Sequence, residues 1–123
     1  MEALSDYESK EKIKRQLKKD QKKIEREIDK FRDEGGDLGV RTLDFQYIID
    51  YYGEHRFDVR VECRKSIQFN PDTINSIKVI VKMHDEYNKE PIRTTCMVLS
   101  KYSIDSIYII IYGIIMAQWD ELV

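Results

Sequence analysis

Histidine, cysteine and carboxylate side chains are where catalysis or metal binding would begin in this chain. His84 is followed directly by Asp85 and Glu86, which could complete a metal site, but no His-Glu-x-x-His or similar spacing supports one. His55 and His84 both fall in turns between predicted strands, and alternate turns of a meander lie at the same end of a sheet. The two rings could approach each other there. Two solvated turn histidines are the simpler interpretation, and we expect no metal ion.

The two cysteines, Cys63 and Cys96, lie in strand-like stretches and belong to no Cys-x-x-Cys or Cys/His ligand spacing. We expect two reduced, buried thiols, because a disulfide would need neighbouring strands and an oxidising compartment. The glycine-rich stretch 35–39 lacks the Lys-Ser/Thr of a phosphate-binding loop and precedes a strand rather than a helix. The sequence therefore predicts no catalytic residues and no cofactor, and a protein that is not an enzyme.

Length and composition set the class of protein. The chain has 123 residues, enough for one domain, and its net charge of -2 creates no overall field toward nucleic acid or anionic membranes. Charged residues make up 36%, which indicates a long solvated segment. Residues 1–23 contain no apolar signal region, and the densest apolar run, 107–117, is far short of the roughly 20 residues of a membrane span. We expect a soluble, cytoplasmic protein without a membrane partner.

The first third of the chain predicts one long helix. Ser5 and Glu8 form a capping box, helix formers continue to Glu34, and Gly35-Gly36 supplies the stop and a hinge. Asp20 and Gln21 interrupt a sparse apolar stripe that consists of Ile13, Leu17, Ile24, Ile28 and Phe31. A helix of about 30 residues is about 45 Å long, whereas the remaining globule should be only about 30 Å across. The helix must therefore overhang the globule or pair with something else.

From Arg41 the apolar period changes to two, which predicts strands. The inward residues of the first strand are Leu43, Phe45, Tyr47, Ile49 and Tyr51, and those of the second are Phe57, Val59, Val61 and Cys63. Those of the third are Ile77, Val79, Val81 and Met83, and a fourth strand covers 92–99. Turns at Gly53, Asn70-Pro71-Asp72 and 84–91 separate the strands. Short polar turns imply an antiparallel meander.

The closing helix, which Ser103 should cap, is apolar nearly all round, and only Asp105, Gly113, Ala117 and Asp120 form a polar or small stripe. One sheet face cannot cover such a helix, so the N-terminal helix, a second copy or a partner must cover the rest. The predicted fold is α+β: residues 1–36 form a charged amphipathic helix with a glycine hinge, and residues 37–123 form a compact ββββα domain whose apolar helix packs on one sheet face.

Two surfaces could bind a polar partner. The second strand alternates in sign on its outer face, Arg56-Asp58-Arg60-Glu62-Arg64, which fits cross-strand ion pairs or a polar recognition face. The stretch 10–26 is basic and could track phosphates, although no aromatic residues are interleaved for stacking. Its predicted nucleic-acid-binding residues are Lys14, Arg15, Lys18, Lys19, Lys22 and Lys23.

Three short features resemble small uncharacterised bacterial and phage α+β domains that end in an apolar helix. They are the strand start at Arg41-Thr42-Leu43, the turn at Tyr52-Gly53, and the helix start Tyr102-Ser103-Ile104-Asp105-Ser106-Ile107. That helix start is similar to a Gly-Val-Asp-Ser pattern, with Tyr102-Ser103 in place of the usual small residue. The resemblance covers the C-terminal two-thirds of the chain. It implies the fold and brings no assigned activity.

We therefore expect a non-enzymatic protein-interaction module. Small size, high charge and the absence of recognisable catalytic motifs are shared with phage anti-CRISPR proteins and toxin immunity proteins, which bind and block a partner protein. The predicted partner-binding residues are the apolar side chains of the two helices: Ile13, Leu17, Ile24, Ile28, Phe31, Tyr108, Tyr112 and Trp119. The alternatives are nucleic-acid binding through the basic helix and a homodimer with paired helices.

Overall fold

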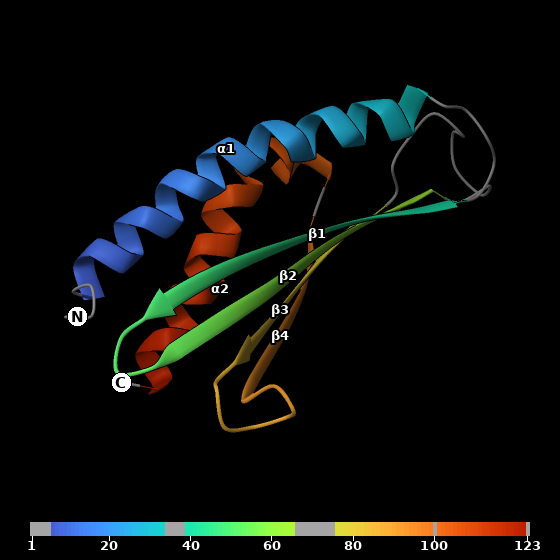
Figure 1. Ribbon diagram of the computed structural model, residues 1–123. Helices are drawn as coiled ribbons and strands as arrows, with labels where there is room; N and C mark the ends of the chain where they lie inside the picture. The colour runs from blue at the N-terminus through green and yellow to red at the C-terminus, as the bar shows by residue number, and fades with distance from the viewer. Residues whose placement is uncertain (1–5, 34–38, 66–75, 100, 123) are drawn as a thin grey trace.

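The computed structural model describes residues 6–33, 39–65, 76–99 and 101–122. The elements in chain order are α1 (Asp6–Asp33), β1 (Gly39–Asp50), β2 (Glu54–Lys65), β3 (Ser76–His84), β4 (Arg93–Leu99), the 3-10 helix η1 (Lys101–Ser106) and α2 (Ile107–Leu122) (Figure 1). The predicted α+β fold is confirmed. The cap at Ser5, the stop at Gly35-Gly36 and the break at Asn70-Pro71-Asp72 lie outside the described residues.

The sheet is the predicted antiparallel meander, with strand order β1-β2-β3-β4. Its strands alternate as expected, and the eight side chains of β2 and β3 that were predicted to point inward are all buried. The β1–β2 turn contains two residues with left-handed backbone, Tyr52 (φ 51°) and Gly53 (φ 111°). This conformation is costly for the tyrosine, which is exposed, and ordinary for the glycine.

Helix α1 neither overhangs the molecule nor needs a partner to cover its apolar stripe. Its 28 residues are about 42 Å long, and β1 and β2, with 12 residues each, are about 40 Å long. α1 runs opposite to β1, with Asp20 bonded to Tyr47 and Phe31 beside Gly39. The expected 30 Å globule was wrong because the β1–β2 hairpin is as long as the helix.

Helices α1 and α2 pack against each other on one face of the sheet, where α1 contacts β1 and α2 contacts β3 (Figure 1). Ile107, Ile111, Ile115 and Trp119 are buried, and Ile109, which is 55% exposed, is the most exposed large apolar side chain of α2. Every described apolar residue of the α1 stripe belongs to the same core as the sheet. Much of the excess apolar surface that the sequence predicted for α2 is therefore covered within one chain, by α1, whereas Ile109 stays exposed.

The start of α2 differs from the prediction. Residues 101–106 form the 3-10 helix η1, so the α-helix begins at Ile107 rather than beside Ser103, whose side chain is not described. Gln21 of α1 supplies the missing cap: its Nε2 donates to the Ile104 carbonyl (2.8 Å), and its Oε1 accepts from the Tyr108 N–H (2.9 Å). A side chain on another helix thus satisfies two backbone groups at this junction.

Asp20, the neighbour of Gln21, is also buried and polar. Its Oδ2 accepts a hydrogen bond from the hydroxyl of Tyr47 on β1 (2.8 Å). Burial, and then this bond, raise the pKa of Tyr47 above its ordinary value. The two residues that interrupt the apolar stripe thus make buried polar contacts from α1, Asp20 with β1 and Gln21 with the start of α2.

Replacing Gln21 with Ala should lower the free energy of unfolding by about 2 kcal/mol, because the Tyr108 N–H and the Ile104 carbonyl lose their partner in a largely buried place. Urea denaturation measures the change. Lys22→Ala, at an exposed position one residue away, is the matched control and should change stability by less than about 0.5 kcal/mol. Equal losses in the two variants would contradict the capping role.

Candidate functional site

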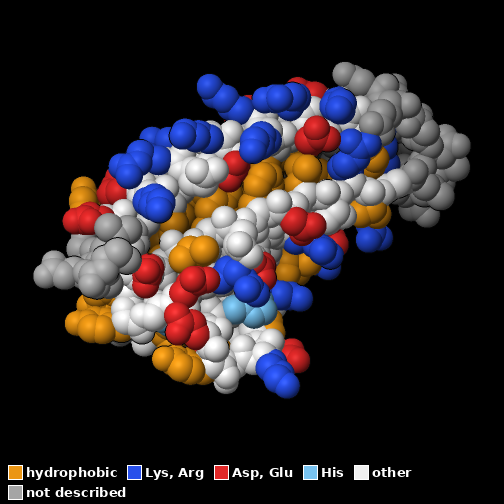
Figure 2. Space-filling view, in the orientation of Figure 1, with side chains coloured by type: hydrophobic (Ala, Val, Ile, Leu, Met, Phe, Trp, Pro, Cys, Tyr) orange, Lys and Arg blue, Asp and Glu red, His pale blue; other side chains and the backbone are white. Residues whose placement is uncertain are grey.

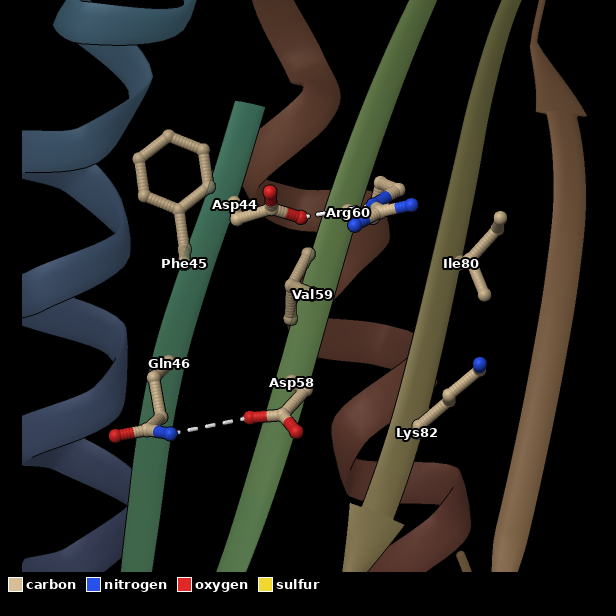
Figure 3. A pocket seen from close by; sticks show the side chains of 8 residues that line it. All are labelled: Asp44, Phe45, Gln46, Asp58, Val59, Arg60, Ile80 and Lys82. Atoms are coloured by element: carbon tan, nitrogen blue, oxygen red, sulfur yellow. Dashed lines mark hydrogen bonds and ion pairs between the residues drawn. The ribbon is translucent and has the colours of Figure 1, made fainter. Parts of the chain in front are cut away.

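The face of the sheet opposite the helices is not covered by any element of the described chain. Side chains from β1, β2 and β3 line a concavity of about 540 Å³ on this open face (Figure 3). The lining residues are Asp44, Phe45, Gln46, Asp58, Val59, Arg60, Ile80 and Lys82. Antiparallel register brings them together, since Asp44 pairs with Arg60 and Arg60 pairs with Ile80.

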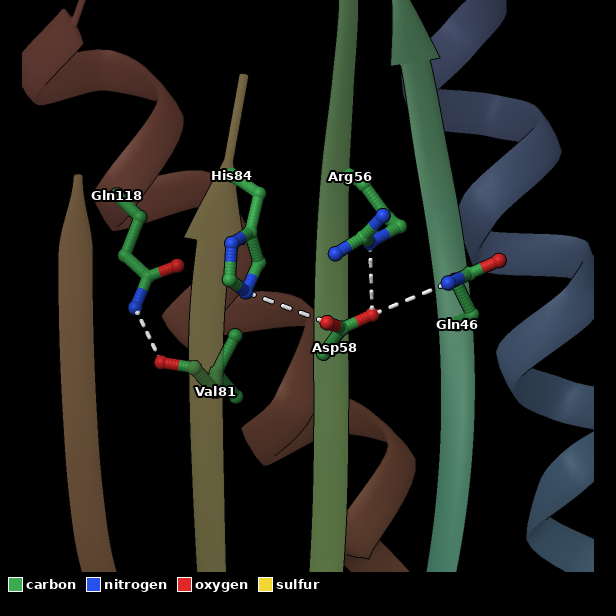
Figure 4. Close-up of polar contacts among 6 residues, drawn as sticks. All are labelled: Gln46, Arg56, Asp58, Val81, His84 and Gln118. Atoms are coloured by element: carbon green, nitrogen blue, oxygen red, sulfur yellow. Dashed lines mark hydrogen bonds and ion pairs between the residues drawn. The ribbon is translucent and has the colours of Figure 1, made fainter. Parts of the chain in front are cut away.

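The polar groups of the open face hold one another in place. Asp58 accepts hydrogen bonds from Gln46 on β1 (3.2 Å) and Arg56 on β2 (3.1 Å), and it forms an ion pair with His84 on β3 (3.2 Å) (Figure 4). Arg60 donates to Asp44 (2.9 Å), which raises the pKa of the guanidinium above its ordinary value. These contacts link three strands across the concavity. The alternating charges of β2 predicted the ion pairs, but not that Asp58 would connect all three strands.

Ile80 and Lys82 complete the concavity from β3. Ile80 is half-buried in its middle strand, and Lys82 is exposed opposite Asp58, without an ion pair in the described part of the chain. The open face therefore combines hydrogen-bonded polar groups, an apolar side chain and an exposed ammonium group opposite Asp58.

The two histidines lie at the same end of the sheet, as predicted, but the sheet separates them. His55 faces the helices, with its ring 5.0 Å from that of Trp119, and His84 lies on the open face with Asp58. Neighbouring carboxylates take part in turns: the Asp85 carboxylate accepts from the Tyr87 and Asn88 N–H groups, and these bonds hold the pKa of Asp85 below its usual range.

No set of three His, Cys, Asp or Glu side chains within the described ranges is arranged to hold a metal ion. Glu86, the other carboxylate beside His84, accepts from the Glu54 N–H (2.8 Å) and so ties the β3–β4 turn to the start of β2. The acidic residues after β3 therefore stabilise turns in this structure.

The cysteines differ in environment, which corrects the expectation of two buried thiols. Cys63 is buried on the helix side of β2, whereas Cys96 is exposed on the open face of β4. Both are free, and burial raises the pKa of the Cys63 thiol to about 11. Cys63 aligns with Ile77 and Cys96 with Ile80, so the two side chains point to opposite faces of the sheet.

The structure places the predicted partner-binding residues mostly in the protein's own core. Six are buried: Ile13, Leu17, Ile24, Ile28, Phe31 and Trp119. Tyr108 and Tyr112 are half-buried, and the ammonium of Lys14 lies 5.9 Å from the centre of the Tyr112 ring. A partner could reach the six buried side chains only if the helices left the sheet.

The predicted nucleic-acid-binding residues are all exposed: Lys14, Arg15, Lys18, Lys19, Lys22 and Lys23. Figure 2 shows Lys and Arg side chains lined up along the outer side of α1. Helical spacing puts Arg15, Lys18, Lys19, Lys22 and Arg26 opposite the buried stripe, and we call these five residues the basic ridge. The ridge and the open face lie on opposite sides of the molecule.

Comparison of the chain with protein-family models, with curated proteins and with solved structures finds no match. The architecture is thus described from the structure alone: an α+β fold in which an antiparallel sheet carries two helices on one face and leaves a polar face open on the other, as far as the described residues show. Of the helices described, none has the length and apolar character needed to cross a bilayer.

Alkylation of the native protein at mildly alkaline pH should modify Cys96 and leave Cys63 unmodified. Cys96 is exposed, whereas Cys63 is buried and its pKa of about 11 leaves little thiolate. Peptide mass mapping after reaction with iodoacetamide measures both sites, and the same reaction in urea should modify both cysteines. Equal rates at the two sites in the folded protein would contradict the burial of Cys63.

Proposed function

We propose that this protein acts by binding a partner protein on the open face of its sheet, and that it is an interaction module rather than an enzyme. The observation that carries the proposal is the polar concavity around Asp58, Arg60 and Lys82, which no described element covers. An inhibitor that blocks its partner by occupying a surface needs only such a face and a rigid support.

The fixed geometry of the open face supports this proposal. Asp58 and Arg60 already hold their neighbours through hydrogen bonds of 2.9–3.2 Å, so little side-chain freedom remains to be lost on binding. Lys82 adds an exposed positive charge opposite Asp58, with no ion pair in the described chain, so an acidic group on the bound protein would complement it. Ile80 supplies apolar contact between the charged groups.

The chemistry of the described titratable groups supports binding over catalysis. The pKa of Cys63 is raised to about 11, His84 is paired with Asp58, and Asp85 is engaged by two backbone N–H groups. These side chains already have structural roles. The two free thiols fit the reducing conditions of a cytoplasm.

Reversing the charge of Lys82 should separate this proposal from its alternatives. We expect immobilised wild-type protein to capture at least one host protein in quantitative mass spectrometry, and Lys82→Glu to reduce that capture about tenfold or more, since one lost charged contact of about 1.4 kcal/mol has this effect. Lys22→Glu makes the same charge change on the far side of the molecule and should capture as wild type does. Equal capture by all three proteins would contradict binding through the open face.

A second candidate function, nucleic-acid binding, has one specific observation in its favour. The five residues of the basic ridge are exposed and span about 17 Å of the outer side of α1. α1 carries eleven Lys and Arg residues against eight Asp and Glu residues, although the whole chain has a net charge of -2. Positive charge is thus concentrated in this layer, where it could attract a polyanion.

Salt dependence tests the second candidate. If the ridge contacts about six phosphates, affinity for duplex DNA or for RNA should fall about a thousandfold between 50 and 200 mM salt. Replacing Lys18, Lys19 and Lys22 with Gln should lower affinity for all sequences alike and reduce the logarithmic salt slope for duplex DNA by about three. Fluorescence anisotropy measures both effects, with Lys82→Gln as the control. Absence of binding at low salt would exclude this candidate.

A further inference from the structure

β4 is an edge strand that lacks the usual protection. It pairs with β3 on one side and with no strand of the described chain on the other. From Thr94 to Leu99 it contains no charged residue, no Gly and no Pro. Met97 is 40% exposed and Val98 is 68% exposed. An uncharged, apolar edge of this kind readily accepts another strand.

The opposite edge of the sheet is protected. β1 carries charged side chains along its length, including Arg41, Asp44 and Asp50, and Arg41 forms an ion pair with Glu27 of the neighbouring α1 (3.2 Å). Charged side chains and an adjacent helix are common means of preventing strand addition. Pairing of β4 with β1 of another copy would also build an open filament, whereas pairing of β4 with itself closes as a dimer.

We propose that β4 pairs antiparallel with β4 of a second copy of this chain, about a two-fold axis at Cys96. This register pairs the whole strand: Thr94 lies opposite Val98, and Thr95 lies opposite Met97. A two-fold axis at Met97 or at Thr95 would extend the register beyond β4, to Lys101 of η1 or to Pro91, and would pair only five strand residues of each copy. The axis at Cys96 avoids both.

Helix α2 permits this pairing on the covered side of the sheet. Gln118 of α2 donates to Thr95 Oγ1 on β4 (2.9 Å), and Glu121 forms an ion pair with Arg93 (3.2 Å), so the last turn of α2 lies beside the start of β4. Glu121 lies on the same side of α2 as Ala117 and Ile110, because these positions recur at helical spacing. This side of the helix carries no other charged residue. The α2 helices of the two copies can thus approach with apolar and small side chains between them.

The dimer leaves the open face uncovered, since β4 extends the sheet sideways. Two open faces would then lie side by side on one continuous sheet. Homodimer formation is independent of the proposed function, because Lys82 lies on the open face and Met97 lies on the helix side of β4.

Light scattering and sedimentation of the full chain should show a dimer of twice the 14.7 kDa chain mass at micromolar concentration, dissociating on dilution. Met97→Lys should raise the dissociation constant about a hundredfold or more, because the interface would bury an unpaired charge. Ile48→Lys is the matched control, since Ile48 is 43% exposed on the protected edge; it should change the constant by less than about threefold.

Cross-linking tests the register without relying on the folding of Met97→Lys. A short bismaleimide should join two wild-type chains through Cys96, because these side chains would be direct cross-strand neighbours. Cys63→Ser should cross-link like wild type, and Cys96→Ser should not. A wild-type chain that remains at 14.7 kDa would overturn the proposal. So would a dimer that Ile48→Lys weakens as much as Met97→Lys, or one that is not joined through Cys96.

Discussion

Helix α2 is apolar on more sides than a sheet can cover, and the arrangement of the molecule follows from that constraint. Each bulky apolar side chain left in water would forfeit roughly 1.5–3 kcal/mol. The sheet covers one side of α2 and α1 covers another, so both helices must lie on the same sheet face. α1 is long because it covers α2 and also follows β1, whose hairpin with β2 is of nearly equal length.

Placing both helices on one side leaves the other face of the sheet without a cover from any described element. That face is polar because period-two alternation sends Asp44, Asp58 and Arg60 away from the core. The same arrangement moves the basic ridge to the far side of α1 and leaves β4 at an edge. The surfaces that other molecules can reach thus follow from the way in which the sheet and α1 cover α2. They differ in character: one mixed in charge, one basic and one uncharged.

Apolar burial has no direction, so polar contacts must determine how α1 lies on its neighbours. Asp20 reaches Tyr47 on β1, and Gln21 reaches the junction of η1 and α2. These adjacent residues interrupt the apolar stripe of α1, and the sequence alone predicted no contact for them. A polar residue within an otherwise apolar stripe indicates a specific buried contact. The sequence does not show which residue makes that contact, because the partner lies far along the chain.

The sequence by itself determined the strands, their alternation, their antiparallel order and the presence of both helices, because each depends on periods and turns within a few residues. Only the tertiary structure decided that α1 would cover α2, that Trp119 and the α1 stripe would be used internally, and that Cys96 would be exposed. The contacts that decide these points join residues far apart in the chain, such as Gln21 with Tyr108, 87 positions away. Local periodicity shows which side of an element is apolar; which element covers that side depends on lengths and directions that exist only in the folded chain.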